Sequence, residues 1–242
     1  FDVKYEDDSG DQKYVHQTTY GMSERLLGAT VATHGDDKGL IMPPSIAPIQ
    51  VVIVPILSKE GSEKIMSAAN EMVKELKSEK IRVKLDDRDI RPGQKYYDWE
   101  IKGVPLRIEL GPRDLKSNSF MCARRTGEKS SYNLQELISS VRKELDLVNE
   151  HMRERAKSHF NQHVKKMPKV EINGSTISFE QKLEDGFVYE MAFEGNDAEA
   201  EMIEKETGFS LLGESTSPYS EKRKCVVTGN PTNNRVFLAK TY

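Results

Sequence analysis

A short, largely apolar run at residues 49–56, IQVVIVPI, constrains the fold more than any other feature of this 242-residue sequence. Continuous runs rich in Val and Ile are typical of strands covered on both faces, as in a parallel sheet flanked by helices. Residues 61–79 follow as an amphipathic helix. Its apolar stripe comprises Ile65, Met66, Ala69, Met72, Val73 and Leu76. Residues 81–87 then alternate as a second strand, so we predict a strand–helix–strand unit with parallel strands at the centre of an α/β domain.

The residues after this unit extend the same domain. Three more elements are predicted, a short helix and two strands: residues 93–103, 104–110 and 118–125. From Asn133 to about Lys165 the pattern is again helical, with Asn133 and Glu136 at capping-box spacing. Its apolar stripe comprises Leu134, Leu137, Ile138, Val141, Leu145, Val148 and Met152. Residues 48–166 are therefore predicted to form an α/β domain closed by a long helix.

Two smaller segments flank this domain. Residues 1–47 contain a β-former-rich stretch over 12–20 that is predicted to turn sharply into a helix over 21–35, followed by a Pro-rich connector at 40–48. Residues 167–242 are predicted to form an α+β unit. Its elements are a turn at Asn173-Gly174, a strand over 187–193, a helix around 197–207, and strands over 223–227 and 234–240. The chain is therefore expected to be multidomain, α/β and α+β.

The charge distribution changes what the net charge alone suggests. The formal net charge is -3, but it is +6 over residues 56–166, -4 over residues 1–55 and -5 over residues 167–242. A basic block between acidic neighbours can attract a polyanion locally. The excess is mild, so an ordinary mixed-charge surface is the alternative interpretation.

Two further features limit the class of protein. No stretch approaches the roughly 20 apolar residues that span a bilayer, and the first residues, FDVKYEDDSG, lack the pattern of a secretory signal. We therefore expect no membrane partner. The two cysteines, Cys122 and Cys225, are too few for a disulfide scaffold, which favours a reducing compartment and a cytoplasmic location.

The run HQTTYGMSERLLGATVATHGDDKGLIMPP at residues 16–44 resembles motif 3 of class II aminoacyl-tRNA synthetases, in the form typical of prolyl-tRNA synthetases. The resemblance implies that residues 1–47 are the end of an antiparallel-sheet catalytic domain. It also implies that Arg25 is the catalytic arginine that holds ATP. The other residues implied are Ser23 and Gln17 for ATP, and Thr18, Thr19 and Gly21 for the proline and adenylate pocket. A guanidinium suits this role because it stabilises charge on the departing pyrophosphate. The alternative for Arg25 is a solvent-facing side chain in the first turn of a helix, paired with Glu24 or Asp36.

The run RDIRPGQKYYDWEIKGVPLRIELGPRDL at residues 88–115, followed by ARRTGEK, is similar to the anticodon-binding domain of the archaeal and eukaryotic type of this family. The resemblance implies that Glu100, Arg107 and Lys129 read the two guanines of proline anticodons. Arginine and lysine donate to guanine O6 and N7, and a carboxylate accepts from the N1–H and N2–H edge. The alternatives are a mutual salt bridge between Glu100 and Arg107, and plain solvation of Lys129. Trp99 is interpreted as a core residue.

The C-terminal unit, residues 167–242, departs from the family pattern. Many relatives carry cysteine pairs for zinc there, whereas this chain has Glu194 and Thr228 where cysteines would stand and keeps only Cys225. Structural zinc typically has four ligands. We therefore predict no zinc and name no metal-ligating residue. Cys122 alternates with Phe120 along a strand and is predicted to be buried.

The resemblance covers nearly all of residues 12–166 and continues more weakly to Tyr242. It implies a proline–tRNA ligase, which uses ATP with Mg²⁺ to form prolyl-adenylate and transfers proline to tRNA(Pro). The whole enzyme is expected to be a homodimer. The 242 residues contain no counterpart of motifs 1 and 2 of class II catalytic domains, so we expect the chain to be a fragment of a longer protein and to be inactive alone. The alternative function is a tRNA anticodon-binding module without catalytic activity.

Overall fold

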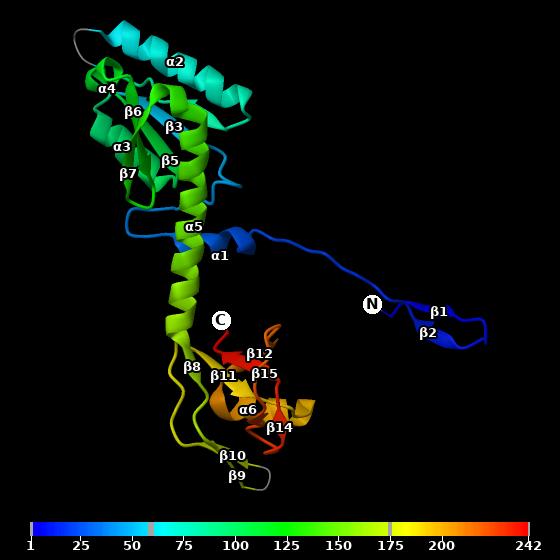
Figure 1. Ribbon diagram of the computed structural model, residues 1–242. Coiled ribbons are helices and arrows are strands. Elements are labelled where there is room, and N and C mark those ends of the chain that lie inside the picture. Colours follow the sequence, from blue (N-terminus) through cyan, green and yellow to red (C-terminus); the bar gives the residue numbers. More distant parts are fainter. Residues whose placement is uncertain (1, 58–60, 174–175, 242) are drawn as a thin grey trace. The chain divides into compact units, whose positions relative to one another are not determined.

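The computed structural model describes residues 2–57, 61–173 and 176–241. The chain divides into two compact units, Phe1–Arg153 and Glu154–Tyr242 (Figure 1). The long helix α5 (Leu137–His163) runs from the first unit into the second. Each unit has its own sheet and its own hydrophobic core, so each is described separately.

The first unit is built on a five-stranded mixed sheet, and the sequence predicts four of its strands. Its strands are β3 (Val51–Pro55), β4 (Val83–Leu85), β5 (Leu106–Leu110), β6 (Ser119–Arg124) and β7 (Lys129–Asn133). Their order is β4-β3-β5-β6-β7, in which β3 pairs in parallel with β4 and β5 while β5, β6 and β7 pair antiparallel. All five residues of β3 are buried, which fits its central place. Strand β7 is not predicted from the sequence, because its residues KSSYN are mostly polar.

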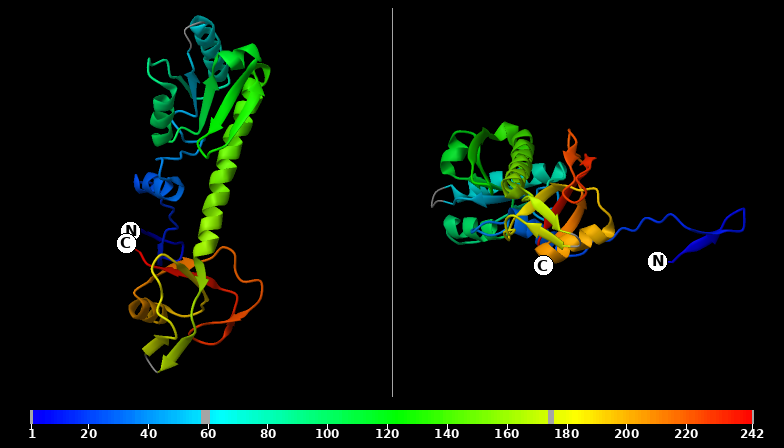
Figure 2. Two further views of the ribbon diagram at one scale, coloured as in Figure 1. Left: turned by 90° about the vertical axis from the view of Figure 1, so that its left-hand side faces the viewer. Right: turned by 90° about the horizontal axis from the view of Figure 1, so that it is seen from below.

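Helices cover both faces of this sheet. They are α2 (Ser62–Ser78), α3 (Pro92–Ile101), the short α4 (Pro112–Lys116) and α5, which a 3-10 turn at Leu134–Glu136 precedes. The apolar stripes of α2 and α5 pack on the face formed by Val51, Ile53 and Ile108, and Figure 2 shows α5 lying along the sheet. The other face, with Val52 and Val54, packs against Trp99 of α3. The predicted core positions of Trp99 and Cys122 are confirmed, because both side chains are buried.

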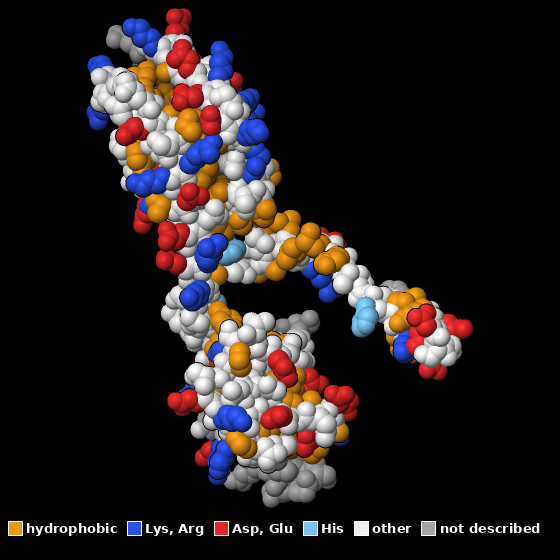
Figure 3. Space-filling view, turned by 45° about the vertical axis from the view of Figure 1, so that its right-hand side comes forward, with side chains coloured by type: hydrophobic (Ala, Val, Ile, Leu, Met, Phe, Trp, Pro, Cys, Tyr) orange, Lys and Arg blue, Asp and Glu red, His pale blue; other side chains and the backbone are white. Residues whose placement is uncertain are grey.

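The described residues 2–35 form little regular secondary structure. A small hairpin joins β1 (Lys4–Glu6) to β2 (Gln12–Tyr14), and α1 (Arg25–His34) follows. The predicted strand over 12–20 is wrong after Tyr14: the Val15 amide still donates to the Val3 carbonyl at 3.1 Å, but residues 16–20 belong to no strand. Hydrophobic side chains along α1, including Leu26 and Leu27, are exposed (Figure 3).

Residues 36–47, which include most of the predicted connector at 40–48, lie against the α/β domain and are called the connector from here on. The side chain of Arg82 donates to the carbonyl oxygens of Pro44, Ser45 and Ala47 at 2.8–3.0 Å. Ile41 is buried against Val148 and Met152 of α5. A single guanidinium thus satisfies three carbonyl groups of the Pro-rich segment.

The second unit has a four-stranded sheet with order β12-β15-β11-β8. These strands are β8 (Val164–Lys166), β11 (Val188–Ala192), β12 (Ser210–Glu214) and β15 (Arg235–Ala239). Smaller strands are β9 (Val170–Asn173), β10 (Thr176–Phe179), β13 (Arg223–Lys224) and β14 (Pro231–Thr232). The helix α6 (Asp197–Thr207) begins at a capping box between Asn196 and Glu199. It ends at Gly208, whose φ is +69°.

The predicted strand over 187–193, helix around 197–207 and strand over 234–240 are present, whereas strands β8 and β12 of the same sheet are not predicted from the sequence. The predicted strand over 223–227 is shorter, because only Arg223–Lys224 pairs with another strand, while residues 226–228 form a turn. The predicted turn at Asn173-Gly174 lies partly outside the described residues. Within the described part of the chain, no helix is long and apolar enough to cross a membrane.

Candidate anticodon-binding site

The register of the sheet brings two of the predicted anticodon residues onto one face. Arg107 of β5 pairs with Ala123 of β6, and Ala123 pairs with Lys129 at the start of β7. Side chains at paired positions of neighbouring strands point to the same face. Ala123 has only a methyl group, so the longer side chains of Arg107 and Lys129 can meet above it.

A carboxylate that the sequence reasoning missed joins these two cations. Glu109 lies two residues after Arg107 on β5, and therefore on the same face. Its Oε1 accepts from Arg107 Nε at 3.1 Å, from Arg107 Nη2 at 3.0 Å and from Lys129 Nζ at 3.0 Å. The signal was present in the sequence, since charged Arg107 and Glu109 alternate with three apolar residues of one strand.

Glu100 completes the cluster from α3. Its Oε1 lies 3.4 Å from Arg107 Nη1, a long hydrogen bond between an 11% exposed arginine and a 32% exposed carboxylate. The salt bridge proposed as the alternative for Glu100 and Arg107 is therefore present. It is compatible with a binding role, because the Glu100 carboxylate and the 53% exposed Lys129 both remain accessible to a ligand.

An aromatic ring supports the cluster. The guanidinium of Arg107 lies over the ring of Tyr96, 4.0 Å from its centroid, and Lys129 Nζ lies 5.9 Å from the same centroid. Burial, together with the nearby Glu109 carboxylate, raises the pKa of Tyr96 to about 12. Tyr96 therefore stays neutral at physiological pH and acts as a flat support for Arg107.

Three other basic residues of this domain are engaged in other contacts, and the register places Arg124 on the opposite face of the sheet from Arg107. Lys95 is buried and donates to the backbone oxygen of Asp86 at 3.0 Å. Arg124 forms ion pairs with Glu128 and Glu144, and Arg125 is buried against Asp36. Lys95, Arg124 and Arg125 therefore add little accessible positive charge, and most of the accessible positive charge of the Glu100–Arg107–Glu109–Lys129 cluster comes from Lys129.

The residues expected to bind ATP and proline lie elsewhere in the first unit. Gln17, Thr18, Thr19 and Gly21 fall in the stretch without regular structure before α1, and Ser23 and Arg25 lie at its start. All six are exposed. Ser23 Oγ accepts from the backbone N–H of Arg25 at 3.3 Å, which is a local helix-start contact. The described residues do not bring these six side chains together into a pocket.

The position expected to be a lost zinc site is organised around Cys225. Its Sγ accepts from the backbone N–H groups of Glu194 at 3.3 Å and Thr228 at 3.5 Å. Burial raises the pKa of this thiol, but the hydrogen bonds from Thr228 and Glu194 outweigh burial and lower the pKa overall. Among the described residues, no group of three or more His, Cys, Asp or Glu side chains is placed to hold a metal ion.

Comparison with known proteins connects this geometry to a family. Residues 50–144 match the family described as anticodon binding domain, and residues 177–242 match the family described as prolyl-tRNA synthetase, C-terminal. The first match contains the whole sheet of the first unit with Glu100, Arg107 and Lys129. The chain belongs to the prolyl-tRNA synthetase family. The matches agree with the expected fold classes of an anticodon-binding domain and a C-terminal α+β domain.

Curated relatives and a solved structure agree with the assignment. The chain is 43% identical over 247 residues to a proline–tRNA ligase of Thermococcus kodakarensis, and 41% identical over 251 residues to one of Methanosarcina mazei. Both alignments include the whole chain, which spans about half the length of these relatives, 50% and 49%. A Giardia lamblia prolyl-tRNA synthetase solved in complex with prolyl-adenylate is 28% identical, with a TM-score of 0.77 over all of this chain and 53% of that chain.

Proposed function

We propose that the cluster of Glu100, Arg107 and Lys129 reads the guanines of a proline anticodon. The observation that carries the proposal is the meeting of two cations and two carboxylates on one accessible face, above Tyr96 and around Glu109. Loop bases of RNA present their edges to proteins, and guanine offers acceptors at O6 and N7 and donors at N1 and N2. Lys129 and Arg107 suit the acceptors, and Glu100 suits the donors.

We propose further that the chain is part of a proline–tRNA ligase, because its full-length curated relatives carry that name. Such an enzyme activates proline with ATP and Mg²⁺ and transfers it to the 3′ end of tRNA(Pro). In this proposal Arg25, Ser23 and Gln17 contact ATP, and Thr18, Thr19 and Gly21 form part of the proline and adenylate pocket. Arg25 supplies a permanent positive charge for the phosphates. We place the enzyme in the cytoplasm as a homodimer.

Without the remaining part of such an enzyme, the chain is proposed to act as an RNA-binding module. The six residues assigned to ATP and proline are exposed in the described structure, whereas the anticodon cluster is already assembled. Binding of tRNA therefore needs no further element, while activation of proline needs a pocket around Arg25.

Filter binding with the 242-residue chain tests the anticodon proposal. Glu100→Gln, Arg107→Gln and Lys129→Gln are each expected to weaken binding to tRNA(Pro) by about ten- to a hundredfold, the worth of a good base contact. Arg142→Gln is the matched control, because Arg142 on α5 pairs with Glu79 and its side chain is 58% exposed. Equal binding of the unchanged chain to a tRNA without the anticodon guanines would contradict the proposal.

Proline-dependent ATP–pyrophosphate exchange tests the catalytic proposal in the longer protein that contains this chain. Arg25→Ala is expected to abolish exchange, because the phosphates lose a fixed positive charge. Lys129→Gln is the control, and it should leave exchange intact since the anticodon is not involved in that step. Normal exchange by Arg25→Ala would show that Arg25 has another role.

A further inference from the structure

Arg125 is an almost completely buried arginine that links two parts of the first unit. It follows β6 directly, and its side chain is only 2% exposed. Its Nη1 and Nη2 donate to the two carboxylate oxygens of Asp36 at 2.9 and 2.5 Å, and its Nε donates to the backbone oxygen of Glu100 at 3.0 Å. A guanidinium is the side chain that can donate in this forked geometry and to a carbonyl at once.

The hydrogen bond from Arg125 to the Glu100 carbonyl helps to cap the C-terminal end of α3. The last carbonyl groups of a helix have no partner inside the helix. Here the Glu100 carbonyl accepts from the Gly103 amide at 3.0 Å as well as from Arg125. Backbone amides of the connector donate to the carbonyl groups of Ile101 and Gly103. The connector bonds are Leu40 N to Ile101 O and Met42 N to Gly103 O, both 3.1 Å.

The backbone of the connector approaches the backbone at the end of α3 too closely for side chains to lie between them. Gly39 has a φ of +122°, and a Cβ there would lie 2.7 Å from the Cα of Ile101. A Cβ on Gly103 would lie 2.6 Å from the Cβ of Leu40. The end of α3 is therefore held by direct backbone contact with the connector, and the Asp36–Arg125 pair lies at the start of that contact.

We propose that Asp36 and Arg125 are positioning residues for anticodon recognition, because they fix the end of α3 and with it the carboxylate of Glu100. The inference rests on the proposed guanine contact of Glu100. The main chain of Glu100 is held by Arg125 on one side, while its carboxylate extends toward Arg107 on the other. Asp36→Asn removes the negative charge that pairs with Arg125. The buried guanidinium is then expected to shift toward other acceptors, and its hydrogen bond to the Glu100 carbonyl at the end of α3 is lost.

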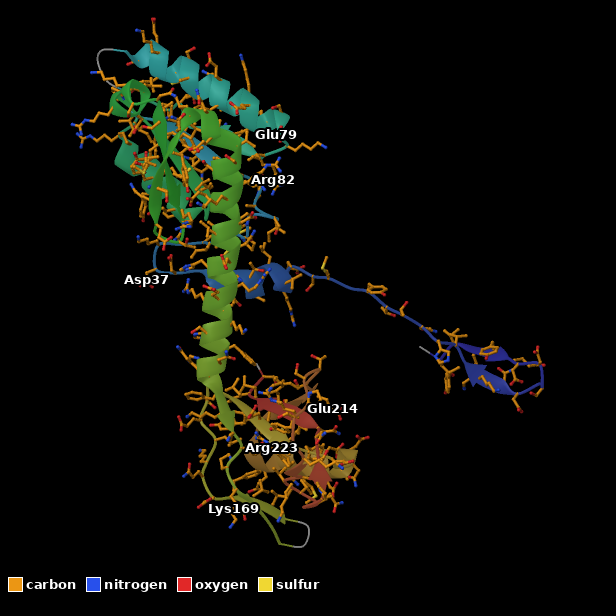
Figure 4. The ribbon with its side chains drawn as sticks, viewed as in Figure 1. Asp37, Glu79, Arg82, Lys169, Glu214 and Arg223 are labelled. Atoms are coloured by element: carbon orange, nitrogen blue, oxygen red, sulfur yellow. The ribbon has the colours of Figure 1, made fainter. Side chains whose placement is uncertain are left out.

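Discrimination between anticodon stem–loops tests the inference with the 242-residue chain. The measured quantity is the ratio of dissociation constants for a stem–loop with adenines in place of the two guanines and for the natural one. Asp36→Asn is expected to lower this ratio by about five- to tenfold. Asp37→Asn is the matched control, since it makes the same charge change at the exposed next residue, labelled in Figure 4.

A double variant separates positioning from a general loss of structure. In a Glu100→Gln background, Asp36→Asn is expected to lower the ratio by less than twofold further, because the group it positions is already changed. A full additional loss in that background would overturn the inference. If Asp36→Asn is not folded at the assay temperature, Arg125→Lys replaces it, because lysine keeps the charge but loses the fork.

The outcomes distinguish the two proposals. If the unchanged chain does not discriminate between the stem–loops, the anticodon proposal and this inference both fail. If the unchanged chain discriminates and folded Asp36→Asn discriminates equally well, the positioning role of Asp36 and Arg125 alone is wrong.

Discussion

Replacing Asp86 by Asn should destabilise the first unit, because this carboxylate anchors α3 to the edge of the sheet. Asp86 is 3% exposed. Its Oδ2 accepts from Trp99 Nε1 at 2.7 Å and from Arg88 Nη2 at 2.7 Å, and its Oδ1 accepts from Arg88 Nε at 2.8 Å. Asn has one acceptor oxygen and no charge, so one of these donors loses its partner.

The magnitude follows from the pKa. Burial raises the pKa of Asp86, but hydrogen bonds from Arg88 and Trp99 outweigh burial and lower it from 3.8 to about 2. A depression of this size corresponds to about 2 kcal/mol of stability in the ionised form. This contribution is fully present above pH 3.8 and is lost as the pH falls through about 2. Asp86→Asn should therefore lower the free energy of unfolding by about 2 kcal/mol at pH 7 and by much less near pH 2.

Urea unfolding followed by tryptophan emission measures this difference directly. Trp99 is the single tryptophan of the chain, so the signal reports on the unit that contains Asp86. Asp87→Asn is the matched control at the exposed neighbouring residue, and its effect should stay within about 0.5 kcal/mol. A destabilisation by Asp86→Asn that is the same at pH 7 and near pH 2 would refute the charge-based reasoning.

Two further predictions concern the connector and the C-terminal unit. Gly39→Ala should destabilise the first unit by about 2–3 kcal/mol in the same unfolding assay, because the φ of Gly39 is positive and an added Cβ would meet the backbone of Ile101. Gly93→Ala is the control and should be neutral or stabilising, because a Cβ there meets nothing within 4 Å. Equal effects of the two substitutions would contradict the close-packing argument. Metal analysis after purification with zinc supplied should find far less than one zinc per chain, because Cys225 offers a single thiolate in that unit. Stoichiometric zinc would show that other ligands complete the site.

Much of the fold of the first unit follows from local patterns. The buried strand at Val51–Pro55 and the stripe of α2 are read from hydrophobic periodicity, which responds directly to burial on one or two faces. Strand β7 was missed because KSSYN is an edge strand, and partner pairing rather than side-chain burial makes it a strand. The strand predicted over 12–20 ends early for the opposite reason, since no described strand pairs with the β-formers at residues 16–20.

The candidate site was predictable in part. The resemblance indicated Glu100, Arg107 and Lys129, and the register through Ala123 explains why Arg107 and Lys129 lie together. Glu109 was not predicted, because its role depends on which side chains meet above the sheet, and a sequence gives that only once strand order and register are known. The partner of the buried Arg125 is Asp36, 89 residues away, and this pair is a long-range contact of the same kind.

The most direct test of guanine recognition replaces the anticodon guanines by inosine, which lacks the N2 amino group. If Glu100 accepts from the N1–H and N2–H edge, inosine should weaken binding to the unchanged chain by about five- to tenfold. The Glu100→Gln variant should bind the guanine and inosine stem–loops with nearly equal affinity. An equal loss in both proteins would contradict the assignment of Glu100 to the guanine edge.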